Sequence, residues 1–203
     1  MALIRVRPLG DDTFMGCWRI EETSADLLQR WPHLECIVKN YHNEEFRREK
    51  LCVYALLYAM TGEEDLMVGH DAAGKPLLDG WHVSLTDTRG FVAVILSRNH
   101  DVGVDIEFMS HRVERIVSRF IREDEQQDTL EEMLVNWSAK ETTYKYFSAD
   151  NLQYFDMRLR PFIPERNGYV EVENLKRNDT AISVGYEVND EYVLTWTTGR
   201  ESD

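Results

Sequence analysis

The sequence predicts an α+β protein with small, mostly antiparallel sheets. Two observations lead to this prediction: strand-like runs follow one another across short turns, and segments with helical spacing of apolar residues lie apart from them. Both halves of the 203-residue chain contain helices and strands of this kind. We therefore expect two similar halves, residues 1–100 and 101–203, that form one compact unit.

In the first half, alternation predicts a short strand over residues 2–8, and apolar spacing predicts helix around Pro32 within residues 25–38. The strongest helix is expected over residues 43–60, where apolar positions form a stripe. Asn43 is suited to cap its beginning and Gly62 to stop it. Three glycines and a proline make residues 69–80 a predicted loop. Strands are expected over residues 81–85, 91–96 and 102–107, the first two joined by a turn at 88–90.

Helical spacing returns in the second half between residues 112 and 147, where we expect two or three helices. Four strand-like runs follow, near residues 155–159, 169–172, 181–188 and 192–196, with a turn at 189–191. No repeat with a solenoid period is present. Each half thus combines helices with a small sheet.

Composition narrows the functional classes. The formal net charge of −14 argues against nucleic acid and anionic membranes as partners, since both attract a positive surface. The sequence has no apolar window long enough to span a membrane and no apolar stretch typical of a signal peptide near its beginning, so we expect a cytoplasmic protein. The three cysteines are too few and too far apart for a disulfide framework or a zinc site, and at least two are expected to be buried.

Two carboxylates stand two residues apart in the strand expected over residues 102–107. Asp105 and Glu107 therefore emerge on one face, about 6 to 7 Å apart along the backbone. Such oxygen donors suit magnesium, which usually takes one or two protein carboxylates together with phosphates and water. The simpler interpretation is an exposed sheet face that is acidic, and these two residues alone favour that interpretation.

A second group of polar residues lies in the segment Trp137-Ser138-Ala139-Lys140-Glu141, which is followed by Lys145. Helical spacing places Ser138, Glu141 and Lys145 on one side of a helix. Ser138 with Glu141 also fits a capping box, and Glu141 with Lys145 fits a surface ion pair. The apolar stripe continues through Ser138, so we expect this serine inside the helix, where it caps nothing.

The combination of these segments resembles a family signature. Gly103-Val104-Asp105-Ile106-Glu107, then about thirty residues, then Trp137-Ser138-Ala139-Lys140-Glu141 with Lys145, resembles the paired motif of the 4'-phosphopantetheinyl transferase superfamily. Gly74-Lys75-Pro76 is similar to the family's coenzyme-binding loop, and Arg48 falls where the family has a basic helix residue. The resemblance covers residues 43–147, and the ends of the chain agree only in pattern.

The resemblance implies the transfer of 4'-phosphopantetheine from coenzyme A to a serine of an acyl or peptidyl carrier protein, with release of adenosine 3',5'-bisphosphate. The chain length matches the surfactin-synthetase-activating type, a monomer of two similar halves arranged as a pseudodimer with the active site between them. Asp105, Glu107 and Glu141 would surround Mg²⁺. Glu141 would accept the serine proton, and Lys145 would hold a pyrophosphate oxygen, so the implied catalytic residues are Glu141, Lys145 and Asp105.

For coenzyme A, the resemblance implies contacts from Arg48, Lys75, Pro76, Lys145 and the triplet Thr86-Asp87-Thr88. The family usually has a histidine at the middle of this triplet. A carboxylate at Asp87 would repel phosphate unless it binds metal or is protonated. This difference leaves open a noncatalytic or altered relative that binds coenzyme A or carrier protein. His82 lies five residues earlier and does not replace the missing ring; we expect it to be a core or surface histidine.

A basic stripe offers a site for the partner. Arg112, Arg115, Arg119 and Arg122 recur every three or four residues after Glu107. Carrier proteins present acidic helices, so Arg112, Arg115 and Arg119 are candidates to dock one; pairing of the arginines with neighbouring glutamates is the alternative. The clustered acids alone also fit a metal-dependent phosphohydrolase, although that class does not explain the basic residues or their order.

Overall fold

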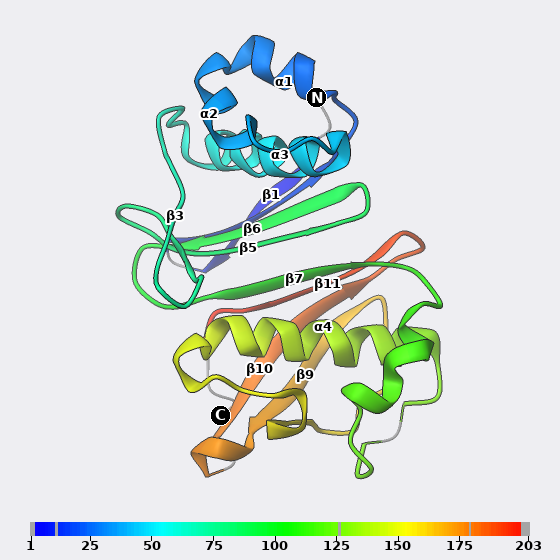
Figure 1. Ribbon diagram of the computed structural model, residues 1–203. Helices are drawn as coiled ribbons and strands as arrows, with labels where there is room; N and C mark the ends of the chain where they lie inside the picture. Colours follow the sequence, from blue (N-terminus) through cyan, green and yellow to red (C-terminus); the bar gives the residue numbers. More distant parts are fainter. Residues whose placement is uncertain (1–2, 11, 126, 179, 200–203) are drawn as a thin grey trace. The chain divides into compact units, whose positions relative to one another are not determined.

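The computed structural model describes residues 3–10, 12–125, 127–178 and 180–199. The chain divides into two compact units, Met1–Arg98 and Asn99–Asp203. Each unit combines helices with an antiparallel sheet, as Figure 1 shows. The prediction of an α+β fold with small antiparallel sheets is therefore confirmed.

The sheet of the N-terminal unit has four antiparallel strands in the order β1-β2-β6-β5. Their bounds are β1 (Leu3–Gly10), β2 (Thr13–Arg19), β5 (His82–Thr88) and β6 (Phe91–Ser97). The sequence analysis missed β2. This strand lies between two others and is buried on both faces, so its residues do not alternate between apolar and polar types.

Helices cover this sheet. They are α1 (Ser24–Arg30), the 3₁₀ helix η1 (Pro32–Leu34), α2 (Glu35–Val38) and α3 (Glu44–Thr61). The predicted helix of residues 25–38 is thus broken into short pieces near Pro32. For α3 the predicted ends are confirmed. Asn43 Oδ1 accepts hydrogen bonds from the N–H groups of Glu45 and Phe46 (2.8 and 3.3 Å), and Gly62 ends the helix with φ of 75°.

The segment predicted as a loop over residues 69–80 contains a small hairpin. Its strands are β3 (Gly69–His70) and β4 (Pro76–Leu77). Gly74 adopts φ of 87° in the turn, and the Asp71 N–H donates to the carbonyl oxygen of Lys75 at 3.0 Å. Gly74, Lys75 and Pro76 are therefore held in a defined turn.

The C-terminal unit has a five-stranded antiparallel sheet in the order β7-β11-β10-β9-β8. The strands are β7 (Gly103–Phe108), β8 (Met157–Leu159), β9 (Asn167–Asn174), β10 (Thr180–Val188) and β11 (Tyr192–Thr197). The strands predicted in this half are confirmed, with shifts at their ends. Because the last strand pairs with β7, Thr195 lies directly opposite Asp105.

Two or three helices were expected between residues 112 and 147. The described chain forms two there, the 3₁₀ helix η2 (Val113–Arg119) and the long helix α4 (Leu130–Tyr146). Thr129 caps α4, and its side chain and that of Glu132 form a capping box. Ser138 lies inside the helix, as predicted. Three short 3₁₀ helices complete the unit: η3 (Ser148–Asp150), η4 (Tyr154–Asp156) and η5 (Leu175–Arg177).

Helix α4 lies across the sheet and is also covered by the segment that follows β7 (Figure 1). It therefore buries residues on more than one side. Polar residues are among them, and several have no exposed surface: Asn136, Ser138, Lys140, Thr142 and Thr143. Four of these five side chains are hydrogen-bonded. The exception is Asn136, whose side-chain nitrogen and oxygen have no hydrogen-bond partner in the described part of the chain. Because burial of polar groups costs free energy unless they are hydrogen-bonded, the four bonded side chains support the packing of this helix.

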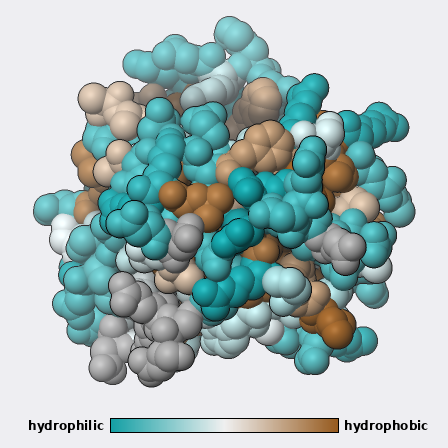
Figure 2. Space-filling view, turned by 90° about the horizontal axis from the view of Figure 1, so that it is seen from below, coloured by the Kyte–Doolittle hydropathy of each residue, from teal (hydrophilic) through white to brown (hydrophobic). Residues whose placement is uncertain are grey.

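The surface and the cysteines agree with the composition. Figure 2 shows a face covered mostly by hydrophilic side chains, with hydrophobic ones in separate small areas. Cys17 and Cys52 are buried and Cys36 is exposed, and none of the three forms a disulfide in the described structure. In the part of the chain that the structure describes, no helix combines the length and the apolar character needed to cross a bilayer.

Candidate active site

Strand β7 and helix α4 bring four of the predicted residues together in the C-terminal unit. Asp105 and Glu107 project from β7 toward α4, which carries Glu141 and Lys145. The contacts with α4 are direct, because Ser138 and Lys145 reach Asp105 while Trp137 reaches Glu107. The alternative of an exposed acidic sheet face is wrong, since Asp105 is only 4% exposed.

Both oxygens of the Asp105 carboxylate have partners. Lys145 Nζ donates to Oδ1 at 2.7 Å, and Ser138 Oγ donates to Oδ2 at 2.9 Å. Lys145 also donates to the carbonyl oxygen of Val104 at 3.0 Å. The Thr195 hydroxyl lies 2.9 Å from Ser138 Oγ and so extends this buried network into β11. Lys145 therefore forms its ion pair with Asp105, and not with Glu141 as the surface-pair interpretation of the sequence had it.

Glu107 is held by the indole of Trp137, whose Nε1–H donates to Oε1 at 2.7 Å. Burial raises the pKa of Glu107 to about 7, and repulsion from Asp105 and Glu141 adds to this rise. The hydrogen bond from Trp137 opposes the rise in pKa. The charged form of Glu107 is thus costly in this cluster unless a further cation approaches.

Glu141 receives a hydrogen bond from the Tyr154 hydroxyl at 2.6 Å. Burial raises the pKa of Glu141, and the nearby Asp105 carboxylate raises it further; Tyr154 and Lys145 act in the opposite direction. Burial, followed by the contact with Glu141, also raises the pKa of Tyr154. Tyr154 therefore remains a hydrogen-bond donor to Glu141 at neutral pH.

The chemistry of this cluster fits a hard divalent cation. Three carboxylates influence one another here, and Lys145 forms an ion pair with one of them, Asp105. Magnesium prefers oxygen donors and usually takes only one or two protein carboxylates, with phosphate oxygens and water completing its shell. Among the described residues no group of three or more histidine, cysteine or acidic side chains is arranged to hold a metal by itself. The residues thus fit a cation that shares its ligands with a bound phosphate.

Apart from Lys145, the residues expected to bind coenzyme A lie in the N-terminal unit. The Arg48 guanidinium donates to two backbone carbonyls, those of Glu22 at 2.7 Å and Ile20 at 3.0 Å. It therefore fastens the segment after β2 to α3. Lys75 and Pro76 lie half-buried at the β3–β4 turn. Their contacts with coenzyme A remain a prediction.

Thr86, Asp87 and Thr88 form the end of β5. Lys50 Nζ lies 3.3 Å from Asp87 Oδ1. Arg47, on the same helix, donates to the carbonyl oxygen of Val38 at 2.9 Å. The Lys50 ammonium offsets part of the repulsion that Asp87 would exert on a phosphate. His82 is exposed at the beginning of β5, so of the two expected roles, core or surface histidine, it has the second.

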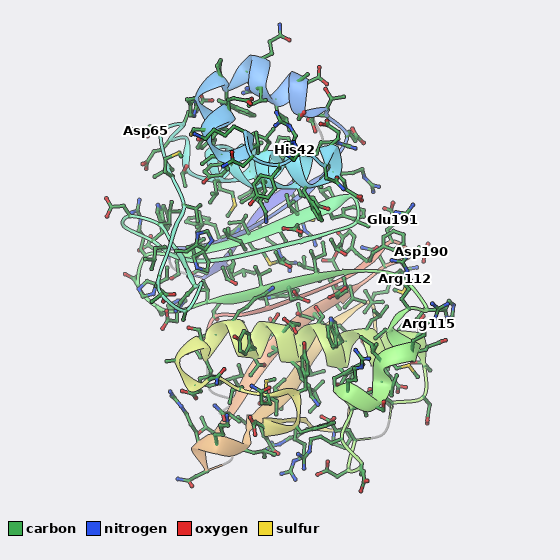
Figure 3. The ribbon with its side chains drawn as sticks, in the orientation of Figure 1. His42, Asp65, Arg112, Arg115, Asp190 and Glu191 are labelled. Carbon is green, nitrogen blue, oxygen red and sulfur yellow. The ribbon has the colours of Figure 1, made fainter. Side chains whose placement is uncertain are left out.

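The basic stripe is shorter than the spacing predicts. Arg112, Arg115 and Arg119 are exposed, and Figure 3 shows Arg112 and Arg115 on the segment around η2. Arg122 instead pairs with Asp124 at 2.8 Å and donates to the carbonyl oxygen of Phe155. Pairing with Glu114 does not occur in the described structure, since His111 bonds that glutamate at 2.7 Å.

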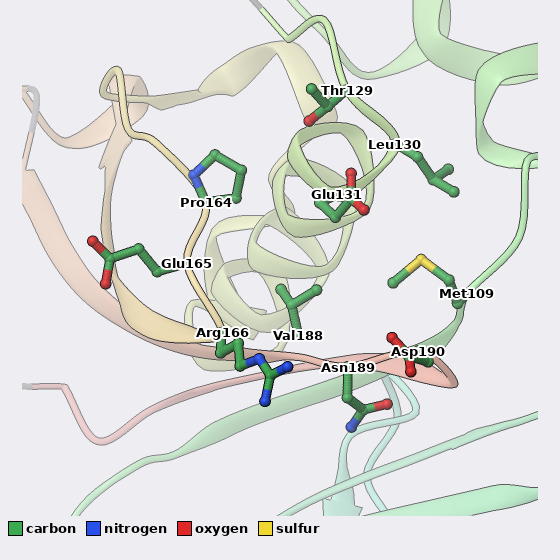
Figure 4. A pocket seen from close by; sticks show the side chains of 10 residues that line it. All are labelled: Met109, Thr129, Leu130, Glu131, Pro164, Glu165, Arg166, Val188, Asn189 and Asp190. Carbon is green, nitrogen blue, oxygen red and sulfur yellow. The ribbon is translucent and has the colours of Figure 1, made fainter.

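An open pocket of about 680 Å³ lies at the beginning of α4 (Figure 4). Met109, Leu130, Pro164 and Val188 give it an apolar lining, and Glu131, Glu165, Arg166 and Asp190 are among its polar residues. None of the carboxylates Asp105, Glu107 and Glu141 lines it. The pocket is therefore separate from the cluster between β7 and α4.

The fold and the cluster together define a class of protein: an α+β unit with acidic residues suited to metal-assisted chemistry on phosphate. Residues 101–197 match the sequence model of the 4'-phosphopantetheinyl transferase superfamily. The matched residues lie within the C-terminal unit and include Asp105, Glu107, Glu141 and Lys145. No curated protein matches the chain.

Two hydrogen-bond donors in this site were missed by sequence reasoning. Tyr154 lies thirteen positions after Glu141, outside the motif, and nothing in the spacing connects the two. Trp137 was noted as part of the motif, but its role as a donor to Glu107 depends on how α4 packs against β7. An unusually polar and aromatic segment after α4 is the only signal that the sequence offers for Tyr154.

Proposed function

We propose that this protein transfers 4'-phosphopantetheine from coenzyme A to a serine of an acyl or peptidyl carrier protein in a Mg²⁺-dependent reaction. The observation that supports this function most directly is the gathering of Asp105, Glu107 and Glu141 beside Lys145 within the segment that matches the superfamily. The proposal takes the chain to be a monomer of the surfactin-synthetase-activating type that acts in the cytoplasm.

In the proposed reaction the carrier serine oxygen attacks the phosphorus that bears the pantetheine group. The bond from this phosphorus to the bridging pyrophosphate oxygen breaks, and its electron pair leaves with adenosine 3',5'-bisphosphate. Glu141 accepts the serine proton, directly or through water. Its raised pKa suits this role, because a carboxylate that is costly to keep charged is a better proton acceptor.

Charge neutralisation is the second requirement of phosphoryl transfer. Mg²⁺, when bound, would neutralise the pyrophosphate oxygens, with Asp105, Glu107 and Glu141 as the protein residues that hold it. Lys145 uses two of its three N–H donors on Val104 and Asp105, so one donor is left for a phosphate oxygen. Arg48, Lys75, Pro76, Thr86, Asp87 and Thr88 are the proposed contacts for the rest of coenzyme A.

Asp87 favours a second candidate function. A carboxylate at this position of the family triplet weakens the expected contact with phosphate, which fits an altered relative that binds coenzyme A or carrier protein without transfer. The ion pair with Lys50 reduces this effect. We therefore rank the active transferase first.

The decisive experiment is to incubate the protein with coenzyme A, MgCl₂ and an apo carrier protein and to measure the intact mass of the carrier. The expected result is a mass increase of one phosphopantetheine group that disappears with EDTA. Binding of coenzyme A without this product would identify the noncatalytic relative. Cleavage of coenzyme A without carrier would identify a phosphohydrolase instead.

Docking of the carrier gives a further prediction. Reversal of charge in the Arg115→Glu/Arg119→Glu double variant is expected to raise the KM for carrier protein roughly 10-fold at low salt and to leave coenzyme A binding unchanged. The reason is that both side chains are exposed and would face an acidic carrier helix. Steady-state kinetics with varied carrier concentration measure this change.

Arg177→Glu is a suitable control, because Arg177 is a partly exposed arginine of the same unit that pairs with Asp150 far from η2 in sequence. It should leave the carrier KM unchanged. If the Arg115/Arg119 variant behaves like this control, the η2 segment does not dock the carrier.

A further inference from the structure

Two aromatic side chains next to the carboxylate cluster form a stacked pair. The rings of Trp137 and Tyr154 have centroids 4.9 Å apart and an interplanar angle of 31°. Trp137 also packs edge-on against the buried Phe120, with centroids 5.0 Å apart. The pair is therefore fixed from one side by the core of the C-terminal unit.

Each member of this pair donates a hydrogen bond to a different glutamate. Trp137 Nε1–H reaches Glu107 Oε1 at 2.7 Å, and the Tyr154 hydroxyl reaches Glu141 Oε1 at 2.6 Å. Both bonds are short, as is typical when the acceptor is charged. The stacked rings thus link a glutamate of β7 to a glutamate of α4.

The bonds leave one oxygen of each glutamate for another ligand. Within residues 3–10, 12–125, 127–178 and 180–199, Oε2 of Glu107 and Oε2 of Glu141 accept no hydrogen bond. Asp105 differs, because Ser138 and Lys145 occupy both of its oxygens. The two glutamates are therefore the members of the cluster with an oxygen that accepts no hydrogen bond from the described residues, whereas Asp105 would share its oxygens between its hydrogen-bond donors and a cation.

The segment that carries Tyr154 is itself anchored. The Gln153 N–H donates to Asp156 Oδ2 at 2.7 Å, and Lys176 Nζ lies 2.9 Å from the same carboxylate. These contacts fix η4, so the Tyr154 hydroxyl is held in place before any ligand binds. Packing against Trp137 needs only the ring, whereas the hydroxyl acts on Glu141 alone among the described residues.

The geometry points to Tyr154 and Trp137 as positioning residues that orient Glu141 and Glu107 so that the second oxygen of each faces a shared divalent cation. This inference rests on the proposed function, because it assigns the cation to the same cluster. Hydrogen bonds from such outer residues fix the orientation of metal ligands, and their loss typically weakens metal binding 10- to 100-fold.

The test uses the full chain with coenzyme A and Mn²⁺, an ion that oxygen ligands also bind, and a protein-free sample corrects for Mn²⁺ held by the coenzyme. Tyr154→Phe removes the hydroxyl and keeps the stacked ring, so the fold should persist. Titration of free Mn²⁺ by electron paramagnetic resonance is expected to show roughly 10-fold weaker binding. Tyr144→Phe is the matched control, since Tyr144 is exposed on α4; this variant should bind Mn²⁺ like the wild type.

Trp137→Phe, which removes the bond to Glu107, is expected to weaken Mn²⁺ binding by a similar factor. In the transfer assay both variants should need more metal for half-maximal rate, with little change in the KM for carrier protein. If the wild type binds Mn²⁺ and both variants bind it with the same affinity, this inference is overturned but the proposed function is not, even if both variants are less stable. A wild-type protein that binds no Mn²⁺ would overturn the proposed function and this inference together.

Discussion

Glu141→Gln is expected to lower the kcat for phosphopantetheine transfer by about 10²- to 10⁴-fold, the usual contribution of a general base. Glutamine keeps an oxygen that can accept the Tyr154 hydrogen bond, but it cannot take the serine proton and is a poor ligand for a cation. The loss should be visible as missing holo product in intact-mass measurements of the carrier protein.

The same variant should fold at least as well as the wild type. Because burial raises the pKa of Glu141, its charged form opposes folding at pH 7, and the neutral amide removes this cost. The sign is that of a raised carboxyl pKa: the contribution to stability is largest at low pH and falls as the pH rises. Thermal unfolding at pH 7 is expected to show an equal or higher Tm.

Glu131→Gln provides the control for this experiment, since Glu131 is an exposed glutamate in the first turn of the same helix. Its kcat should match the wild-type value. Residual transfer by Glu141→Gln at the wild-type rate would show that Glu141 is neither the base nor an essential ligand. A lower Tm together with lost activity would indicate that the variant loses activity because it misfolds. That outcome would contradict the prediction that the charged form of Glu141 opposes folding.

Helices and strands whose limits are set by residues close together in the sequence could be predicted from the sequence. Asn43 and Gly62 set the ends of α3 because capping involves only the adjacent turn. Alternation identified β7 and placed Asp105 and Glu107 on one face. Strand β2 was missed because it is buried on both faces. Such a strand lacks the alternation of apolar and polar residues by which the other strands were predicted.

In the candidate site, too, features of a single strand or helix could be predicted from the sequence, and contacts between elements could not. Spacing alone placed Asp105 and Glu107 on one face of a strand, since a strand fixes the direction of its own side chains. The resemblance to the family added Glu141 to this group. Their partners could not be predicted, because Lys145 and Tyr154 reach them across elements. Arg122 shows the opposite error: the repeat placed it in the basic stripe, and a local aspartate binds it instead.

One residue of the motif has a structural partner that the sequence did not suggest. Lys140 precedes Glu141 and is completely buried. Its Nζ donates to Glu125 Oε2 at 2.7 Å and to the carbonyl oxygen of Phe120 at 2.6 Å. Glu125 also accepts from the backbone N–H of Leu159 at 2.6 Å. This pair therefore joins α4 to the segment after η2 and to β8.

Lys140→Met is expected to lower the free energy of unfolding by about 3 to 5 kcal/mol, the range found when one member of a buried ion pair is removed. The cost arises because the variant leaves the buried Glu125 carboxyl group without the ammonium that pairs with it. Burial already lowers the pKa of Lys140, against the attraction of Glu125, so the charged ammonium depends on this partner. Urea unfolding followed by circular dichroism measures the change.

Lys176→Met is the matched control, because Lys176 forms an exposed ion pair with Asp156 in the same unit. Its loss should cost at most about 1 kcal/mol. The double variant Lys140→Met/Glu125→Gln should regain part of the stability that Lys140→Met loses, since it removes the unpaired carboxyl group but keeps an acceptor for Leu159. A Lys140→Met protein as stable as the Lys176→Met control would show that the buried pair does not hold α4 in place. The orientation of Glu141 would then have to depend on other contacts of the helix.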